Sequence, residues 1–492
     1  MRPGCTTDDV EHGAEIVAPR QLWIGGRWRA AADGATFPVI DPATEEQIAA
    51  VADGTAADLL DAVAAAEAAR HAWAARPPRE RGEVLRRIHA EMLAHADALA
   101  ELIVRENGKA LGEARSEVTY AAEFFRWYAE EAVRLEGRVV TAPGGANRIL
   151  VLHQPIGVAL CITPWNFPAA MATRKIAPAL AAGCGVVLKP ASETPLTALA
   201  LAALYAAAGV PAGLVNVVPT RRHREAVGAA LRDARVRKLS FTGSTEVGRA
   251  LLAQAAERVV KCSMELGGNA PFVVFADADL EGAIAGAMIA KMRHGGEACT
   301  AANRFLVEAS IAPAFTARLA AAMGALRMGP GLAPGVELGP MVNAATRDKI
   351  DGLVRTAVAG GARVVTGGVR PRGRGFFYPP TVLADVAPDA AILGEEIFGP
   401  VAPIVTFDDE ATAVRLANAT EHGLTAYVFT GDLARGLRVA ERIEAGMVGL
   451  NRGLVSDPAA PFGGMKQSGV GREGGREGLL AFTETQYVAV AW

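Results

Sequence analysis

The sequence is poor in cysteine and histidine, and neither sign of charge is in large excess. Five cysteines and eight histidines are spread over 492 residues, without the Cys-x-x-Cys or His-Glu-x-x-His spacings of disulfide-rich or zinc proteins. We therefore expect no metal and a reducing, cytoplasmic location. Fifty basic against 53 acidic side chains give a formal charge of −3. The sequence has no basic stripe of the kind that phosphate backbones require, which argues against a nucleic-acid partner.

Long uninterrupted apolar runs are also missing. The uncharged stretch 194–220 is interrupted by Pro195, Gly209, Pro211 and Gly213 and is rich in alanine. It predicts a buried helix followed by a buried strand, not a membrane span. Residues 1–18 contain acidic side chains and no apolar core, which predicts a flexible tail and not a secretory signal. We expect no membrane partner.

The sequence does have size and a regular alternation of strand-like and helix-like segments. With 51% apolar residues, it can form the cores of two or three domains. Strand-like runs such as IGVALCIT, GVVLKP, GLVNVV and VRKLSF alternate with helical segments, the βαβ pattern of a parallel, doubly wound sheet. A second alternation runs from APFVVF to MVGLN. These patterns predict two α/β domains.

The predicted architecture is an α/β protein with a Rossmann-type cofactor domain, a catalytic α/β domain and a small β oligomerisation segment. Its parts are a tail (1–18), a dinucleotide-binding domain (19–134 and 154–262), a catalytic domain (263–465) and two bridging segments (135–153 and 466–492). Three long helices are expected ahead of the first sheet, over 58–75, 79–106 and 112–134. The extended bridging segments fit neither domain, and such strands often pair with another subunit. We expect a homodimer or a homotetramer.

Two segments carry candidate thiol chemistry. Cys299 follows Gly295 and Gly296 in RHGGEACTAANR, and Glu265 lies in MELGGNAPFVVF. A free thiol has a pKa of about 8.5 and is a useful nucleophile only where its surroundings favour thiolate. Glycines let backbone N–H groups approach the sulfur and an oxyanion formed beside it, and the alanine-rich stretch that follows is compatible with a helix. The alternative is a buried structural cysteine. That is the interpretation for the other four: Cys5, Cys161, Cys184 and Cys262.

The segment FTGSTEVG follows the strand VRKLSF and places Gly243 and Gly248 around the first turn of a helix. Free N–H groups at a helix N-terminus favour a phosphate, and dinucleotides bind at such strand-to-helix junctions. The alternative is a well-capped helix with Ser244 or Thr245 as its N-cap.

Taken together, these motifs resemble the aldehyde dehydrogenase superfamily over nearly the whole chain. The matching strings are ITPWNFP, LKPAS, FTGSTEVG, MELGGNAPFVVF, GGEAC, EEIFGP and PFGGMKQSGVGREG. Within the superfamily the sequence is most similar to NAD(P)-dependent succinate-semialdehyde dehydrogenases, on strings such as PWNFPAAMATRK, KMRHGGEAC and GLVSDPAAPFGGMKQSG.

The resemblance implies roles for the matching residues. Cys299 would attack the aldehyde carbon, and the Asn166 amide with the Cys299 backbone N–H would hold the oxyanion. Hydride would pass to NADP or NAD, and Glu265 would be the general base for water that hydrolyses the thioester. Lys175 and Glu484 match positions that assist proton transfer. The cofactor-binding positions would be Thr163, Trp165, Lys189, Ser192, Gly243, Ser244, Glu396 and Phe398. Lysine at a strand end is otherwise more often solvated.

The resemblance also implies a carboxylated substrate. Arg174, Arg293 and Ser456 match positions that hold the distal carboxylate of succinate semialdehyde, and Phe462 completes the substrate-binding set. The planar guanidinium can bind a carboxylate at two points. The alternative for each arginine is a structural ion pair. Glutarate semialdehyde carries the same two functional groups, so the chain length of the substrate stays open, as does another aliphatic aldehyde.

Three positions depart from the family pattern. Ala301 replaces a second cysteine that many relatives use for a regulatory disulfide. Glu297 replaces the usual glutamine, and a like charge near the sulfur would oppose thiolate formation. Ser192 replaces a glutamate of many NAD-preferring relatives and leaves room for a 2′-phosphate, with arginines at 221, 222 and 224 nearby. We expect NADP to be preferred and NAD tolerated.

Two other function classes remain possible at this stage. A thioesterase or amidase would use Cys299 with a histidine base, for which His294 is the nearby candidate in the sequence. A catalytically idle nucleotide-binding protein would keep the fold alone, which the joint presence of Cys299, Glu265 and Asn166 argues against.

Overall fold

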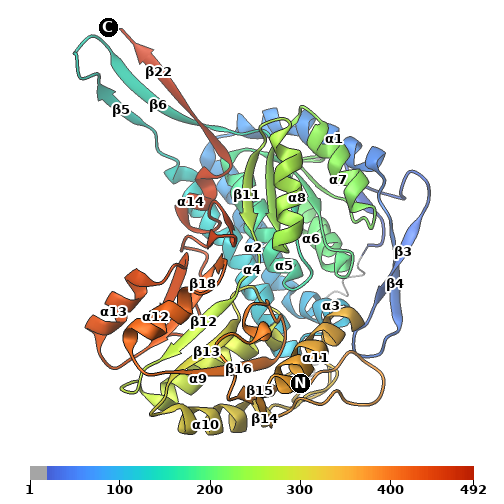
Figure 1. Ribbon diagram of the computed structural model, residues 1–492. Helices are drawn as coiled ribbons and strands as arrows, with labels where there is room; N and C mark the ends of the chain where they lie inside the picture. The colour runs from blue at the N-terminus through green and yellow to red at the C-terminus, as the bar shows by residue number, and fades with distance from the viewer. Residues whose placement is uncertain (1–18, 492) are drawn as a thin grey trace, which may run out of the picture.

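Two large sheets organise residues 19–491, the part of the chain that the computed structural model describes (Figure 1). The predicted tail and Cys5 lie outside these residues. The first sheet has the order β2-β1-β9-β8-β7-β10-β11-β21. Its strands are β1 (Leu22–Ile24), β2 (Arg27–Arg29), β7 (Val158–Ile162), β8 (Gly185–Lys189), β9 (Val215–Val217), β10 (Val236–Thr242), β11 (Lys261–Glu265) and β21 (Gly469–Val470). The five strands from β9 to β11 are parallel.

Helices cover both faces of this sheet because its central strands are apolar on both sides. In β7, Val158, Leu160 and Ile162 pack into one core, and Ala159 and Cys161 into the other. The first core is closed by α1 (Ala56–Ala74), α7 (His223–Arg232) and α8 (Thr245–Ala256). The second is closed by α2 (Pro78–Ala94), α3 (Ala96–Asn107), α4 (Leu111–Glu131), α5 (Pro168–Ala182) and α6 (Pro195–Ala207).

The strand order places a topological switch between β7 and β10. From β7 the chain proceeds outward through β8 and β9, then returns to β10 on the other side of β7. In open parallel sheets, ligands bind at the carboxyl ends of the strands that flank such a switch. The segments that follow β7 and β10 therefore form the edge where a cofactor is expected.

The second sheet has the order β14-β15-β16-β13-β12-β18-β19, and only the β14–β15 pair is antiparallel. Its strands are β12 (Ala270–Val274), β13 (Ala302–Glu308), β14 (Arg363–Thr366), β15 (Thr381–Ala384), β16 (Val401–Phe407), β18 (Thr425–Phe429) and β19 (Met447–Leu450). One face packs on α9 (Leu280–Met292) and α10 (Ala312–Gly324). The other packs on α11 (Ala344–Ala359), α12 (Glu410–Asn418) and α13 (Leu433–Arg442).

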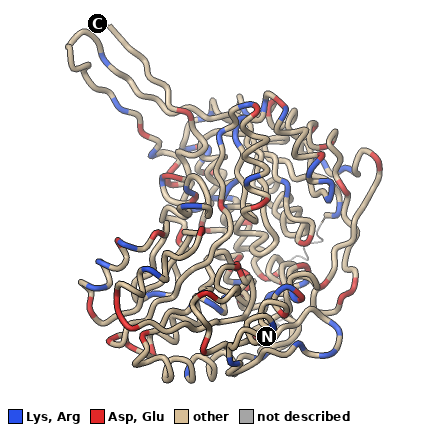
Figure 2. Tube along the Cα trace, in the orientation of Figure 1, with Lys and Arg blue, Asp and Glu red and all other residues tan. Residues whose placement is uncertain are grey.

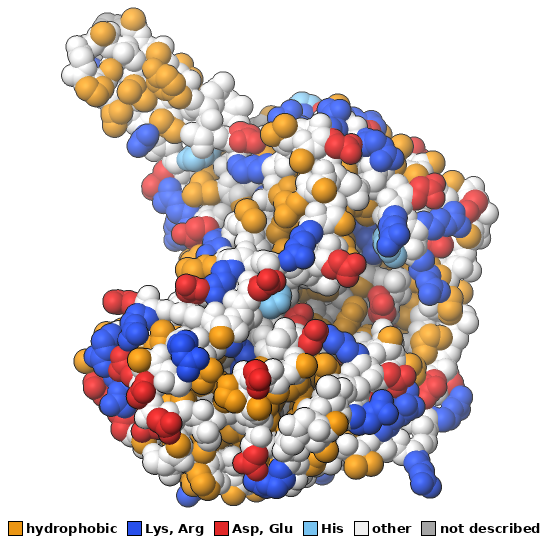
Figure 3. All heavy atoms as spheres, viewed as in Figure 1, with side chains coloured by type: hydrophobic (Ala, Val, Ile, Leu, Met, Phe, Trp, Pro, Cys, Tyr) orange, Lys and Arg blue, Asp and Glu red, His pale blue; other side chains and the backbone are white. Residues whose placement is uncertain are grey.

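A third, three-stranded sheet projects from the body of the molecule (Figure 1). It has the antiparallel order β22-β6-β5, built from β5 (Arg138–Thr141), β6 (Arg148–Pro155) and β22 (Thr483–Val490). Apolar side chains gather on it (Figure 3), among them the exposed Val139, Val140, Leu152 and Tyr487. It comprises parts of both predicted bridging segments.

The remaining elements are short. They are the hairpin β3 (Thr36–Ile40) and β4 (Gln47–Ala52), the pair β17 (His422–Gly423) and β20 (Met465–Lys466), α14 (Gly475–Leu480), and the 3-10 turns η1 (Ala132–Arg134), η2 (Arg293–Gly296) and η3 (Ala391–Leu393). Within residues 19–491, none of the helices has the length and apolarity needed to cross a membrane. Positive and negative side chains are interspersed along the trace (Figure 2).

Several predicted boundaries differ from the structure. The helix expected over 79–106 is two helices, α2 and α3, separated at His95. The helix considered after Cys299 is the strand β13, because this segment is paired on both edges inside the second sheet. The boundary drawn between 262 and 263 falls inside β11, and β21 joins the first sheet although it lies in the predicted 466–492 segment. Cys161 and Cys184 are buried as expected, whereas Cys262 is half-buried.

Candidate active site

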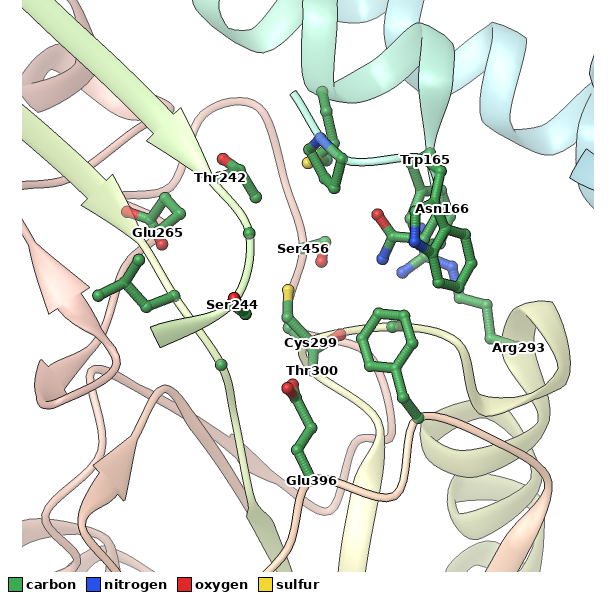
Figure 4. A pocket seen from close by; sticks show the side chains of 18 of the residues that line it. Trp165, Asn166, Thr242, Ser244, Glu265, Arg293, Cys299, Thr300, Glu396 and Ser456 are labelled. Atoms are coloured by element: carbon green, nitrogen blue, oxygen red, sulfur yellow. The ribbon is translucent and has the colours of Figure 1, made fainter. Parts of the chain in front are cut away.

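A cavity of about 260 Å³ opens at the switch point of the first sheet, against the second domain (Figure 4). The loops that follow β7, β10 and β11 line one side, and η2 with the loop before β16 lines the other. Twelve predicted site residues line it, ten of which are Trp165, Asn166, Arg174, Gly243, Ser244, Glu265, Arg293, Cys299, Glu396 and Phe398. Ser456 and Phe462 line it as well.

Backbone close approach shapes the loop that carries Cys299. Gly296 has φ +78°, and a Cβ there would lie 2.3 Å from the Gly399 carbonyl oxygen. A Cβ on Gly268 would lie 2.1 Å from the carbonyl oxygen of Cys299 itself. Side chains at either position would displace the nucleophile, which explains why glycine precedes it and why MELGG faces it.

Burial has the largest influence on the Cys299 thiol. Burial raises its pKa to about 12, and the nearby Arg174 guanidinium only partly opposes this effect. The expectation that the glycine loop favours thiolate is therefore wrong for the protein without ligands, because burial outweighs it. Activation has to come from a base or from a positive charge that binds beside the sulfur.

Asn166 lies across the cavity from Glu265, with Cys299 between them (Figure 4). The buried amide Nδ2 donates to the Glu297 carbonyl oxygen at 2.9 Å, which ties it to the Cys299 loop. This places an amide group beside the sulfur, where an oxyanion would form.

Glu265, at the end of β11, is 2% exposed. Neither of its carboxylate oxygens has a hydrogen-bond partner in the described structure. Burial, followed by repulsion from Glu473, raises its pKa well above the ordinary value. A buried carboxyl group with an elevated pKa and free oxygens has the properties of a general base or acid.

Glu473 is a site residue that the sequence interpretation missed. Lys175 donates to its Oε1 and to Ser240 Oγ, the latter at 3.1 Å. Burial pushes the pKa of Glu473 up, but Lys175 and Arg174 outweigh this and hold it below its usual value. A buried chain of titratable groups therefore runs from Lys175 through Glu473 to Glu265.

The structure corrects the expectation for Glu484. Its side chain is 52% exposed in β22 and forms an ion pair with Lys261 at 3.6 Å. It does not line the cavity. The carboxylate beside Lys175 belongs to Glu473, so Glu484 is not placed to transfer protons there.

The other cofactor candidates surround the switch point. The Thr163 N–H donates to the Lys189 carbonyl oxygen at 3.2 Å, at the adjacent ends of β7 and β8. Ser244 is the N-cap of α8 and accepts the Val247 N–H at 3.4 Å. The capping interpretation is thus confirmed, and the first N–H groups of α8 lie beside the cavity.

Lys189 is 8% exposed, so the solvated alternative does not hold, and burial lowers its pKa. Ser192 Oγ donates to Glu193 Oε2 at 3.2 Å. The Glu193 carboxylate thus lies next to the position where a 2′-phosphate has been expected. Among the three nearby arginines, Arg222 forms ion pairs with Asp33 and Asp53.

Two residues shape the second-domain side of the cavity. Glu396 Oε1 accepts the Gly268 N–H at 2.9 Å, and burial raises its pKa to about 7. Phe398 packs edge-on against Trp165 with ring centroids 5.4 Å apart, and it has φ +56°. This positive φ is uncommon for an aromatic residue and holds the ring toward the other domain.

Both candidate substrate arginines line the cavity. Arg174, 2% exposed, donates from Nη2 to Tyr120 at 2.6 Å and lies over the Phe462 ring at 4.0 Å. Its Nε and Nη1 lack hydrogen-bond partners, and Glu473 is 3.9 Å away. Arg293 lies over the Phe167 ring at 4.9 Å.

These contacts weigh against the structural ion-pair alternative. Arg293 forms no ion pair with any residue of 19–491, and the Arg174 pair is long. Two guanidinium groups that share a cavity with a nucleophile provide a binding site for an anionic group.

Glu297 and His294 do not act on the sulfur as the sequence suggested. Glu297 Oε1 accepts the Val342 N–H at 3.1 Å, and burial raises its pKa well above the usual range. A protonated carboxyl turned toward Val342 does not oppose thiolate formation. Burial also lowers the His294 pKa strongly, and the ring packs against Phe167, outside the cavity lining. His294 therefore does not act as a base for Cys299.

Comparison with known proteins agrees with this geometry. The aldehyde dehydrogenase family model matches residues 28–488. A succinate-semialdehyde dehydrogenase of Paenarthrobacter nicotinovorans is 56% identical over 444 residues, covering 90% of this chain and 99% of that protein. A glutarate-semialdehyde dehydrogenase of Pseudomonas putida is 47% identical over 472 residues, covering 96% and 98%.

Solved structures give the same result. The crystal structure of succinate-semialdehyde dehydrogenase from Burkholderia pseudomallei has a TM-score of 0.95 at 48% identity, covering 96% of this chain and 98% of that one. The sheet order, the switch-point cavity and the family match over most of the sequence lead to one conclusion. The chain belongs to the aldehyde dehydrogenase family and is an NAD(P)-dependent aldehyde dehydrogenase.

Proposed function

We propose that the protein oxidises succinate semialdehyde to succinate. The observation that carries this proposal is the pair of guanidinium groups, Arg174 and Arg293, that share the cavity of Cys299. Within residues 19–491 their one ion pair is the long contact of Arg174 with Glu473, at 3.9 Å. A distal carboxylate is the substrate group that such a pair recognises. Ser456 supplies a further hydroxyl at the same wall, and Phe462 packs against Arg174.

The residues of the cavity divide the chemistry between them. The Cys299 thiol first releases its proton to solvent. The thiolate sulfur then forms a bond to the aldehyde carbon, and the carbonyl π electrons move to oxygen, where the Asn166 amide stabilises the negative charge. When bound, the nicotinamide would accept the hydride, and its positive ring would favour the thiolate. Glu265 then takes a proton from water as the water adds to the thioester. Cleavage of the carbon–sulfur bond releases succinate and returns Cys299.

The cofactor preference proposed here is NADP, with NAD tolerated. Ser192 leaves space where a longer acidic side chain would repel a 2′-phosphate, and the side chains of Arg221 and Arg224 are exposed nearby. The Glu193 carboxylate opposes this preference, and Lys189 beside it partly offsets the charge. Measured kcat/KM values with both cofactors test the proposal. A clear NAD preference would refute it.

The proposed assembly is a homodimer or homotetramer through the projecting sheet. Its exposed apolar side chains, Val139, Leu152 and Tyr487 among them, are what a second copy of the chain would cover. A cytoplasmic, reducing location is proposed because the nucleophile must stay a free thiol.

The direct experiment follows cofactor reduction at 340 nm with succinate semialdehyde, glutarate semialdehyde and butanal. The proposal expects the highest kcat/KM with succinate semialdehyde and no activity in Cys299→Ala. Glutarate semialdehyde is the second candidate, because the same two arginines would accept its carboxylate. A higher kcat/KM with glutarate semialdehyde would show that the five-carbon substrate is preferred. Equal kcat/KM values for butanal and succinate semialdehyde would show that the arginines do not recognise a carboxylate. Thioester or amide hydrolysis without cofactor reduction would favour the thioesterase alternative.

A further inference from the structure

The sequence segment Glu106-Asn107-Gly108-Lys109, the end of α3 and the start of the turn to α4, has no role in the chemistry above, yet it contacts the loop that forms the cavity wall. Asn107 Nδ2 donates to the Trp165 carbonyl oxygen at 3.1 Å. Lys109 Nζ donates to the Asn166 carbonyl oxygen at 2.8 Å. Two consecutive carbonyls of the loop after β7 are therefore fixed by side chains more than fifty positions earlier in the chain.

Lys109 is also paired with Glu117 of α4, and both side chains are fully buried. Glu117 Oε1 accepts the backbone N–H groups of Ala169 and Ala170, at 2.9 and 3.2 Å, in the first turn of α5. The loop that carries Asn166 is thus held from two directions. Lys109 holds its carbonyl, and Glu117 holds the start of the helix that follows it.

The same face of α4 reaches the nucleophile loop and the substrate arginine. Residues four and three positions apart lie on one face of a helix, and Glu113, Glu117 and Tyr120 have this spacing. Glu113 Oε1 accepts the His294 N–H at 2.5 Å, at the strained turn before Cys299. Tyr120 accepts from Arg174. One helix face therefore contacts the segments that carry Asn166, Cys299 and Arg174.

We propose that the buried Lys109–Glu117 pair is a positioning device for the oxyanion donor: it fixes the Asn166 backbone so that the side-chain amide is aimed at the carbon bound to Cys299. Stability alone explains the pair poorly, since desolvation offsets most of the attraction in a buried ion pair. Asn166 is held at its other end by the Glu297 carbonyl. This inference rests on the proposed aldehyde oxidation.

The test is a double-mutant cycle between the pair and Asn166. Lys109→Met combined with Glu117→Gln removes both charges together, keeps an amide oxygen for the α5 N–H groups, and deletes the bond to the Asn166 carbonyl. We expect the rate constant of the pre-steady-state burst of cofactor reduction to fall roughly 10- to 100-fold, as it does when a catalytic group is slightly misplaced. The KM for the cofactor should be unchanged. When Asn166 is already replaced by alanine, the same double substitution should lower this rate constant by less than about 3-fold.

Glu106→Gln is the matched control. Glu106 is another buried carboxyl group that holds a helix N-terminus, through the N–H groups of Leu196 and Thr197 in α6, and it does not touch Asn166. Any decrease in the burst rate constant that Glu106→Gln causes should be the same in the wild-type and the Asn166→Ala backgrounds. Equal losses for the neutralised pair in both backgrounds would overturn the proposal. If the double variant does not fold, Glu117→Gln alone replaces it in the cycle.

Hydrogen exchange of residues 164–170 provides a reading that does not depend on activity. The amides of Asn166 and Phe167 should exchange faster in the neutralised variant than in the wild type, because the loop loses the bond from Lys109 to the Asn166 carbonyl, and unchanged exchange would contradict the positioning role. Wild-type activity tests the proposed function separately. A wild type without aldehyde-dependent cofactor reduction would refute that function, whereas an active wild type with an additive cycle would refute only the role of the pair.

Discussion

Replacing Arg293 with methionine isolates the recognition of the substrate carboxylate. The guanidinium lies over the Phe167 and Tyr120 rings, at 4.9 and 5.9 Å, and forms no ion pair within the described residues. Methionine keeps an unbranched apolar chain against these rings and removes the charge. No protein carboxylate loses a partner, so we expect the fold to be retained.

The size of the effect follows from what the substrate loses. A hydrogen bond to a charged group contributes about 1.5–3 kcal/mol, and about 1.4 kcal/mol corresponds to a factor of ten. The variant should therefore lose roughly 10- to 150-fold in kcat/KM with succinate semialdehyde. With butanal, which has no carboxylate, we expect a loss of about 2- to 3-fold at most, because only the ring contacts and the small effect of the Arg293 charge on the Cys299 thiol are altered.

The assay compares initial rates at 340 nm for both aldehydes at saturating cofactor. Arg81→Met is a suitable control, because Arg81 is a buried arginine that donates to backbone carbonyls of Ala181 and Arg76, away from the cavity. Any decrease in kcat/KM caused by Arg81→Met should be equal for succinate semialdehyde and butanal. Equal losses in the Arg293 variant would show that this residue is structural and would refute the carboxylate interpretation.

Three further predictions concern charge. Ser192→Glu should shift the kcat/KM ratio toward NAD by roughly 10-fold or more, because a carboxylate repels the 2′-phosphate; an unchanged ratio would contradict this. Glu473→Gln should move the acid limb of the kcat–pH profile to lower pH, since Glu473 raises the pKa of Glu265, and an unmoved limb would argue against their coupling. Lys291 is buried, its Nζ has no hydrogen-bond partner among residues 19–491, and burial lowers its pKa to about 7. Because the unfolded chain binds more protons than the folded protein between about pH 7 and 10.5, wild-type stability should rise over this window. The Lys291→Met variant should be more stable than the wild type near pH 7 by about 1–3 kcal/mol. The difference in Tm between the two proteins should narrow toward pH 10, and a difference that stays constant would contradict the lowered pKa of Lys291.

Local patterns were sufficient to predict the βαβ core and much of the cavity. Residues such as Asn166, Glu265 and Cys299 directly follow or end predicted strands, or lie in glycine-rich loops, so their positions follow from sheet topology. Glycine at 296 and 268 was informative because backbone contacts leave no space for a side chain there.

Contacts between residues far apart in the chain could not be predicted from the sequence. Lys175 and Glu473 are 298 positions apart, and no local signal favours Glu473 over Glu484. The position of Glu484 explains the error only afterwards, because it lies in the projecting strand β22, where residues 484–487 are all exposed. The thiol pKa was mispredicted for a similar reason, since burial depends on both domains closing over Cys299.

The most direct test of the account is to trap the acyl group on the nucleophile. Glu265→Gln removes the base that activates water, so the thioester should accumulate during turnover of succinate semialdehyde with NADP. Rapid acid quench, digestion and mass spectrometry should then find one succinyl group on the peptide that contains Cys299. A Cys299 peptide that stays unmodified while cofactor is reduced, or undiminished oxidation by Cys299→Ala, would contradict the account.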